Sequence, residues 1–246
     1  MGLDAIVQAR MSSTRLPSKV LMVLDGSTIL EHIIFRLQKS NVISRIIIAT
    51  SNHESDDPIE ELGKNLNITV FRGELNDVLK RYYDCATKYN CKDIIRITGD
   101  CPLIDPNLID LAYKNYVKFG YDLYGLGGEF PDGFDFTIFK YSLLKQANIN
   151  AFLPSEREHV CVYMEKHSVN QGAFKPFLNC QHLRFTVDQK EDIEFLNKLY
   201  EKDSDLFLLN SHEIINLYNS LEQDAITNDH ITRNEGYLKS LKNDKV

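Results

Sequence analysis

Short apolar runs alternate with longer amphipathic stretches through the first half of the chain. Apolar runs predict strands at 5–9, 45–50, 69–72 and 93–98, and the stretches between them predict helices at 29–39, 58–66, 78–89 and 106–119. Repeated strand–helix units build a mostly parallel sheet that is covered on both faces. The pattern therefore predicts an α/β fold with one Rossmann-like, mostly parallel sheet and helices on both faces.

The regular alternation ends after residue 119. Residues 121–140 are rich in glycine and aromatic side chains, which indicates loops and shorter strands in a small β-rich insertion. The run 183–187 predicts a late strand that enters the sheet, and a helix is expected at 191–201. The C-terminal tail, 223–246, is polar and weakly patterned, so either a terminal helix with a frayed end or an arm that packs on a partner fits it.

Composition narrows the class of protein. The chain has 246 residues, 43% of them hydrophobic, and a net charge of -7, which supports a sizeable core and disfavours a nucleic-acid partner. No apolar run of about 18 residues and no secretory leader pattern is visible, so we expect a cytoplasmic protein with no membrane partner. Five cysteines without a Cys-x-x-Cys pair argue against a disulfide framework and a structural zinc site.

One loop stands out by its charge. Residues 5–24 contain Arg10, Arg15 and Lys19 but no carboxylate, and the loop follows the first predicted strand. Ligands of open α/β sheets bind beyond the carboxyl ends of the strands. Ser12 and Ser13 are small enough to let backbone N–H groups approach phosphate oxygens, while the cations bind the same oxygens. A phosphate-binding loop and a plain basic surface loop are equally compatible with this spacing.

Two aspartates follow predicted strands. Asp100 comes just after the fourth strand, beside the basic loop if the first and fourth strands are neighbours. Phosphates would repel a lone carboxylate there, but Mg²⁺ typically binds one or two carboxylates together with substrate phosphates. Asp188, at the end of the late strand, could be the second carboxylate or an ordinary helix cap. Asp105 is better explained as a cap.

Other charged stretches are less informative by themselves. Residues 155–159 concentrate charge at the start of a helical stretch, which is typical of a solvated first turn, and 131–135 form a turn pattern with two acids. The chain has no P-loop, no early dinucleotide fingerprint, no nucleophile elbow and no His-Glu-x-x-His helix. These motif-defined classes of enzyme are therefore disfavoured.

Several sequence blocks occur in order over roughly the first 200 residues: 6–21 (IVQARMSSTRLPSKVL), 56–59 (DDPI), 71–73 (FRG), 77–83 (DVLKRYY), 96–105 (RITGDCPLID), 131–135 (PDGFD), 155–159 (SEREH) and 183–188 (LRFTVD). Together they resemble the cytidylyltransferase family, in the branch of spore coat polysaccharide biosynthesis proteins. The resemblance implies a nucleotide-diphospho-sugar transferase type of fold. Related enzymes activate acidic sugars as CMP conjugates.

The resemblance also implies roles for individual residues. It assigns catalysis to Arg10, Arg15, Lys19 and Asp100, nucleotide binding to Ala9, Arg10, Ser12, Ser13, Arg15, Lys19, Asp77 and Thr98, acceptor binding to Asp132, Asp135, Glu156, Arg157 and His159, and metal binding to Asp100 and Asp188, with Mg²⁺ as the cofactor. One departure is Ser18, because the family usually has glycine at this position. A serine there leaves the cationic positions intact.

The sequence therefore predicts a CTP-dependent nucleotidyltransferase that activates an acidic sugar or related acceptor, with release of pyrophosphate, for surface polysaccharide or glycan biosynthesis. Its partners would be CTP, a small anionic sugar or phosphorylated acceptor, and a second copy in a homodimer. We expect one domain over 1–246, in which 121–180 binds the acceptor and contributes a possible dimerisation arm. The alternatives are a metal-dependent glycosyltransferase of related fold, which would usually carry Asp-x-Asp, and a non-catalytic nucleotide-binding domain.

Overall fold

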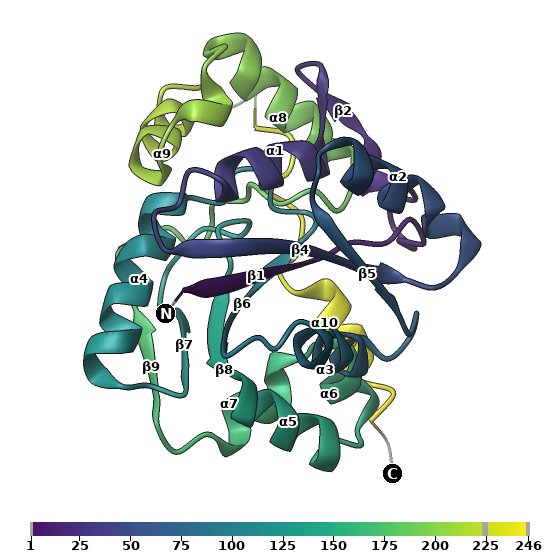
Figure 1. Cartoon of the computed structure of the whole chain (residues 1–246). Helices are drawn as coiled ribbons and strands as arrows, with labels where there is room; N and C mark the ends of the chain where they lie inside the picture. The colour runs from purple at the N-terminus through teal and green to yellow at the C-terminus, as the bar shows by residue number, and fades with distance from the viewer. Residues whose placement is uncertain (1, 223–225, 245–246) are drawn as a thin grey trace.

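The structure is a computed structural model that describes residues 2–222 and 226–244. A single mixed sheet lies at its centre. Within the described residues, seven strands form this sheet in the order β5-β4-β1-β6-β8-β7-β9 (Figure 1). The strands are β1 (Leu3–Gln8), β4 (Ile43–Ser51), β5 (Thr69–Gly73), β6 (Asp93–Thr98), β7 (Leu123–Leu126), β8 (Thr137–Lys140) and β9 (Gln171–Phe174), and β2 (Val23–Leu24) pairs with β3 (Ser27–Thr28) in a small hairpin. Pairs β1–β4, β1–β6, β4–β5 and β7–β9 are parallel, whereas β8 is antiparallel to both its neighbours. The predicted α/β fold with a mostly parallel sheet is confirmed.

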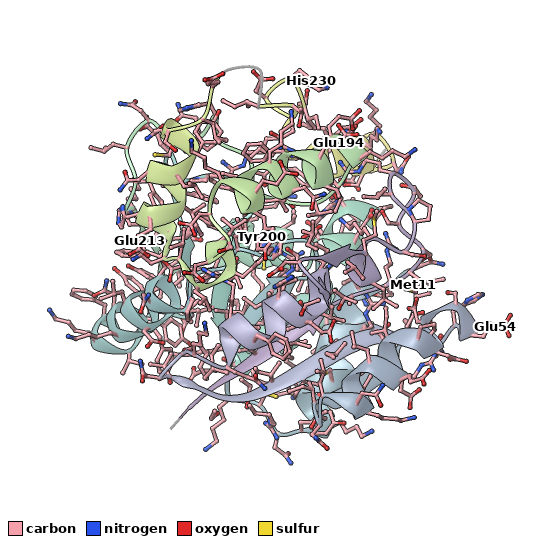
Figure 2. The ribbon with its side chains drawn as sticks, turned by 90° about the horizontal axis from the view of Figure 1, so that it is seen from above. Met11, Glu54, Glu194, Tyr200, Glu213 and His230 are labelled. Atoms are coloured by element: carbon pink, nitrogen blue, oxygen red, sulfur yellow. The ribbon has the colours of Figure 1, made fainter. Side chains whose placement is uncertain are left out.

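Helices cover both faces of this sheet. They are α1 (Ile29–Leu37), α2 (Asp57–Asn65), α3 (Val78–Lys88), α4 (Pro106–Phe119), α5 (Tyr141–Asn150), α6 (Pro154–Glu158), α7 (Cys161–His167), α8 (Lys190–Lys202), α9 (Ser211–Asn219) and α10 (Glu235–Leu241), with 3₁₀ turns η1 (Lys19–Leu21), η2 (Glu54–Asp56) and η3 (Leu206–Leu208). Figure 1 shows α1 and α2 on one side of β1 and β4, and α3 and α5 on the other. Seen from above in Figure 2, α8, which carries Glu194 and Tyr200, lies beside α9 with Glu213.

The central strands β1 and β4 are mostly apolar because both of their faces are largely buried. Successive side chains of a strand point to opposite faces. In β1, Ala5 and Val7 join the core under α1, α4 and α8, whereas Ile6 joins the core under α3 and α5. In β4, Ile48 and Ile47 divide in the same way. This explains why the sequence shows continuous apolar runs rather than alternation.

Capping side chains fix several helix starts. The Asp105 carboxylate accepts the N–H of Asn107 at 2.8 Å and caps α4, as predicted. Thr28 caps α1 in a capping box with Glu31. The helix expected from residue 58 begins at Asp57, but Asp56 does not cap it by its side chain, since that carboxylate turns toward the basic loop.

The segment expected to form a β-rich arm belongs to the main body instead. Its strands β7, β8 and β9 extend the same sheet. The aromatic side chains Phe134, Phe136 and Phe139 are buried, at 0%, 4% and 0% exposed, and therefore contribute to the core. The expected homodimer stays a prediction.

The prediction of a late strand at 183–187 that enters the sheet is wrong, because this segment does not join the sheet. Its pairing is limited to a single bridge between Arg184 and Asp132. The reason lies in its partner, a turn in which Gly133 adopts φ +100° and leads the chain away after one residue. No ladder can continue from there.

The described part of the C-terminal tail packs on its own chain, where α10 lies against α6 (Figure 1). This favours the terminal-helix interpretation of 223–246 for the residues from 226 to 244, while 223–225 and 245–246 lie outside the described residues. Among the helices of the described residues, none has the length and apolar character needed to cross a bilayer.

Candidate active site

The site lies where β1 and β6 end side by side. These strands are parallel neighbours, with Gln8 opposite Thr98. The N–H of Gly99 donates to the Gln8 carbonyl at 2.9 Å, and a Cβ at this glycine would lie 2.8 Å from that oxygen. Because only glycine permits this close approach, the chain brings Asp100 directly beside the basic loop. The predicted juxtaposition of the first and fourth strands is confirmed.

The basic loop is held in shape by hydrogen bonds to its backbone. The fully buried Asp56 carboxylate accepts the Met11 N–H at 2.8 Å and also bonds Thr50 and Ser51 of β4. At the other end of the loop, the Ser18 N–H donates to the Met11 carbonyl at 2.9 Å. Sequence reasoning treated Asp56 only as part of a motif and missed its anchoring role.

Ser18 adopts φ 60° and ψ 14°, which is the left-handed region. Glycine populates this region without steric cost, whereas a residue with a Cβ is strained there. The structure thus explains why the related motif usually has glycine at this position. Ser18 adopts this conformation despite its Cβ, and Arg15 and Lys19 on either side of it in the loop line the cleft.

Two carboxylates share one ammonium group at the centre of the site. Lys19 Nζ lies 2.8 Å from Asp100 Oδ2 and 2.6 Å from Asp188 Oδ1. Arg15 Nη2 lies 2.7 Å from the other Asp188 oxygen. Burial by itself lowers the pKa of Lys19, but its attraction to Asp100 and Asp188 outweighs burial and raises that pKa above its ordinary value. Burial opposes ionisation of Asp100, yet Lys19 holds the pKa of this carboxyl well below its usual range.

Asp188 does not cap α8. Its backbone N–H and that of Gln189 both donate to the Asp192 carboxylate, at 2.8 and 2.9 Å. Asp192 therefore satisfies the N–H groups at the start of the helix. The extended segment before Asp188 is fixed at its end by the Val187 N–H, which donates to the Asp100 carbonyl at 2.8 Å. The alternative interpretation of Asp188 as a helix cap is therefore wrong, and its carboxylate is directed to the basic loop.

A cleft of about 350 Å³ opens over these groups. Its lining includes the predicted residues Ala9, Arg10, Ser13, Arg15, Lys19, Thr98, Asp100, Asp132, Asp135, His159 and Asp188. Residues from every predicted class, nucleotide-binding, acceptor-binding and metal-binding, thus meet in one cleft of a size that suits a small ligand.

The structure does not bring four predicted residues to this lining: Ser12, Asp77, Glu156 and Arg157. Asp77 caps α3 by accepting the Lys80 N–H at 2.9 Å, and Arg157 Nε donates to the same carboxylate at 3.0 Å. Glu156 is buried and pairs with Lys166 at 3.3 Å. These contacts give the three charged residues structural roles in the described chain, connecting α3, α6 and α7.

Asp132 and Asp135 form an acidic pair in the cleft. Burial and the neighbouring Asp135 raise the pKa of Asp132 to about 7, although Arg184 and Arg233 oppose the rise. Arg184 Nη1 lies 2.8 Å from Asp132, and Arg233 Nη2 lies 3.4 Å from Asp135. Burial also raises the pKa of Asp135, which accepts the Gly133 N–H at 2.8 Å.

Sequence reasoning missed two groups of cleft residues. Arg81 and Arg96 line the cleft from α3 and β6, and their position inside strongly patterned elements made them look like ordinary members of those elements. The other group comes from α10: Glu235 Oε2 lies 3.4 Å from Arg15 Nη1, and the ring of Tyr237 meets His159 edge-on with centroids 5.2 Å apart. The weak pattern of the tail gave no signal for this contact.

The donor set also suits a divalent cation. Two carboxylate oxygens converge on the Lys19 ammonium, so the chain already focuses hard oxygen ligands on one position of positive charge. Among the described residues, no group of three or more His, Cys, Asp or Glu side chains is placed to hold a metal by itself. A pair of carboxylates that needs further oxygens from a ligand matches the preference of Mg²⁺.

Cations and paired carboxylates at the carboxyl edge of a mostly parallel α/β sheet form a site whose charges suit a phosphorylated ligand. The particular family follows from comparison. The family model for cytidylyltransferases matches residues 5–223, and this chain belongs to that family.

Individual relatives agree with this placement. The chain is 33% identical over 224 residues to the spore coat polysaccharide biosynthesis protein SpsF of Bacillus subtilis, covering 87% of this chain and 92% of the relative. It is 30% identical over 112 residues to a 3-deoxy-manno-octulosonate cytidylyltransferase of Geobacter metallireducens, covering 46% and 43%. A solved cytidylyltransferase from Leptospira borgpetersenii superposes with a TM-score of 0.87 at 31% identity, covering 95% of this chain and 100% of that one.

Proposed function

We propose that this chain transfers the cytidylyl group of CTP to a small anionic acceptor, a sugar acid or a phosphorylated compound, and releases pyrophosphate. The observation that carries the proposal is the convergence of Arg15 and Lys19 with Asp100 and Asp188 at the ends of β1 and β6. The names of the relatives, a polysaccharide biosynthesis protein and a sugar-acid cytidylyltransferase, support an acceptor of this class.

The contacts of Arg15 and Lys19 suggest how the nucleotide enters. Their cations are held by Asp188, Asp100 and Glu235, whose carboxylates occupy the place of phosphate oxygens. On binding, the triphosphate takes over these cations through charge-assisted hydrogen bonds. Asp100 and Asp188 are thereby freed to hold Mg²⁺, which when bound orients the phosphates and neutralises developing charge.

Little covalent chemistry is required of the protein. An acceptor oxygen attacks the α-phosphorus of CTP in line, and the bond to the departing pyrophosphate breaks while Arg15 and Lys19 stabilise its negative charge. If the attacking group is a hydroxyl, its proton passes to Asp135, a cleft carboxylate whose pKa is raised by burial and therefore better suited to accept a proton.

The test is pyrophosphate release from CTP with Mg²⁺, with ATP, GTP and UTP in parallel, over a panel of sugar acids, sugar phosphates and neutral sugars. We expect release with CTP and one class of anionic acceptor, and a loss of about 10²-fold or more in the Asp100→Asn and Arg15→Gln variants. A matched control is Arg72→Gln, since Arg72 pairs with Asp57 and Glu60 and does not line the cleft. Transfer from a nucleotide sugar without pyrophosphate release would instead identify a glycosyltransferase.

A further inference from the structure

Arg81 and Arg96 line the cleft and, like the cleft residue Arg10, form no ion pair with a carboxylate of the described residues. Arg81 is 1% exposed, and its Nη1 donates to the Glu74 carbonyl at 3.0 Å, while its buried Nε has no hydrogen-bond partner. Arg96 Nε donates to the Gln8 side chain at 3.2 Å. Within residues 2–222 and 226–244, neither guanidinium forms an ion pair. Burying a cation without a counter-ion is costly, so this arrangement calls for an explanation.

Most other arginines of the described residues have carbonyl or carboxylate partners. Arg36 is satisfied by three backbone carbonyls, those of Ile104, Phe207 and Leu209. Ion pairs with carboxylates are formed by Arg15, Arg45, Arg72, Arg157, Arg184 and Arg233. Arg10, Arg81 and Arg96, which all line the cleft, are thus the exceptions among the described residues, although the full sequence contains 35 acidic residues.

His159 adds a third unsatisfied group to the same cleft. Its Nε2 is buried without a hydrogen-bond partner, and the Glu158 carboxylate lies 3.9 Å away, beyond hydrogen-bond distance. Burial is the largest cause that lowers the pKa of His159, and Arg96 and Arg10 lower it further. His159, Arg96 and Arg10 all line this cleft.

No carboxylate of the described residues forms an ion pair with Arg96. Burial lowers the pKa of Arg96, but it is opposed by Cys161 and Tyr82 first and by Asp100 and Asp135 after them, so that the pKa is raised. These carboxylates are engaged elsewhere, since Asp100 bonds Lys19 and Asp135 bonds Arg233. The N–H donors of Arg96 that Gln8 does not occupy remain for a ligand.

We propose that Arg81, Arg96 and His159 form a second anion-binding site, separate from the Arg15–Lys19 pair, which receives the acid group of the acceptor. The inference rests on the proposed function and deepens it by assigning residues to the acceptor. A carboxylate and a phosphate share the required chemistry, because each accepts paired hydrogen bonds from a planar guanidinium. Arg10 also lines the cleft, and its charge acts on both Arg81 and His159.

The experiment compares the wild type with Arg96→Gln, Arg81→Gln and Arg96→Lys, and uses Arg15→Gln as the matched nucleotide-site variant. Calorimetry first measures CTP binding in the presence of Mg²⁺. Thermal unfolding of the CTP-saturated protein is then followed during titration with inorganic phosphate or acetate, with sodium chloride at equal ionic strength as reference. Near-ultraviolet circular dichroism checks that each variant is folded, and Arg96→Lys keeps the charge if the glutamine variant does not fold.

We expect a saturable rise of the wild-type melting temperature with phosphate or acetate, and the anion that acts identifies the acid group. In Arg96→Gln and Arg81→Gln the apparent affinity for that anion should fall about tenfold or more, as for loss of a charge-assisted hydrogen bond, while CTP affinity changes less than about threefold. Arg96→Lys should retain part of the anion affinity. Arg15→Gln should show the opposite selectivity.

Three results would overturn the second site: no saturable shift with either anion in the wild type, equal shifts in the wild type and both glutamine variants, or a loss of CTP affinity in Arg96→Gln as large as in Arg15→Gln. A failure of the proposed function gives a different result, because the wild type then shows no CTP binding in calorimetry. The same anion titrations on the nucleotide-free protein still decide whether Arg81 and Arg96 bind an acid group.

Discussion

Replacing Lys19 by methionine removes the one ammonium that joins Asp100 and Asp188, and keeps a side chain of similar length. In the wild type, Lys19 is 10% exposed, and Asp188 and Asp100 are 14% and 24% exposed, so the three groups are only partly screened by water. Since both carboxylates lie within hydrogen-bond distance of one nitrogen, they would face each other across the position it vacates.

The expected cost follows from this geometry. Two negative charges about 5 Å apart repel each other by about 3 kcal/mol at an effective dielectric constant of about 20. Arg15 continues to neutralise Asp188, and the carboxylates can turn toward water, so part of this repulsion is relieved. We expect the Lys19→Met variant to lose about 2–4 kcal/mol of unfolding free energy at pH 7, in line with removal of one partner from a buried pair.

The pH dependence has a definite sign. Lys19 holds the pKa of Asp100 below its ordinary value, so the stability that Asp100 contributes is complete above about pH 4 and is lost as the pH falls further. The raised pKa of Lys19 keeps the ammonium charged throughout this range. The difference in stability between wild type and variant should therefore shrink as the pH is lowered from 5 to about 2.

Urea unfolding at several pH values measures these differences, and MgCl₂ provides a second readout. Because Mg²⁺ would occupy the place of the lost ammonium, it should stabilise Lys19→Met more than the wild type. Lys64→Met is a suitable control, since Lys64 is 69% exposed in its pair with Glu60 and should contribute less than about 1 kcal/mol. A Lys19→Met variant as stable as this control at pH 7, with no added response to Mg²⁺, would refute the shared ion pair.

Three further predictions concern the cleft and its support. In the Asp135→Asn variant, turnover should fall by about 10²-fold and the acidic limb of the pH–rate profile should disappear, whereas an unchanged profile would exclude Asp135 as proton acceptor. Because folding raises the pKa of Asp135, wild-type stability should also decline as the pH rises above the ordinary carboxyl range, and this decline should be smaller in the variant, where Asp132 still titrates. Arg157→Met should lose about 1–3 kcal/mol in urea unfolding through its bonds to Asp77 but keep the KM for the acceptor, and a raised KM would return Arg157 to the acceptor site. Gly133→Ala should lower both stability, by about 1–3 kcal/mol, and turnover, because φ is +100° and the added Cβ would lie 2.5 Å from the Phe185 backbone; wild-type values of both would contradict this.

Local pattern was sufficient for the strand–helix half of the fold. The positions of a parallel strand that are buried on both faces are mostly apolar, as at 5–7 of β1 and at Ile94 and Ile95 of β6, and this constraint is visible in the sequence alone. The same holds for the basic loop after β1 and for Asp100 after β6, since parallel strands that pair bring their carboxyl ends together. Capping by Asp105 likewise depends on neighbours two residues away.

Contacts between distant segments could not be read in this way. Asp77 and Arg157 are 80 residues apart, and the bonds between them decide that neither lines the cleft. Asp188 and Asp192 both lie near the start of α8, but the carboxylate that accepts a backbone N–H there is that of Asp192, and the donor is Asp188. The segment 183–187 has the composition of a strand but meets a turn rather than a strand edge, so it cannot form a ladder.

The sequence by itself determined the α/β class, the cationic loop and the two aspartates, because these depend on residue type, on side-chain period and on the order of strands. Only the tertiary structure decided that Lys19 lies between Asp100 and Asp188, that α10 brings Glu235 to Arg15, and that Arg81 and Arg96 share a cleft without counter-ions. Charge pairing depends on distances in space. Separation along the chain does not fix those distances until the sheet and its covering helices have packed.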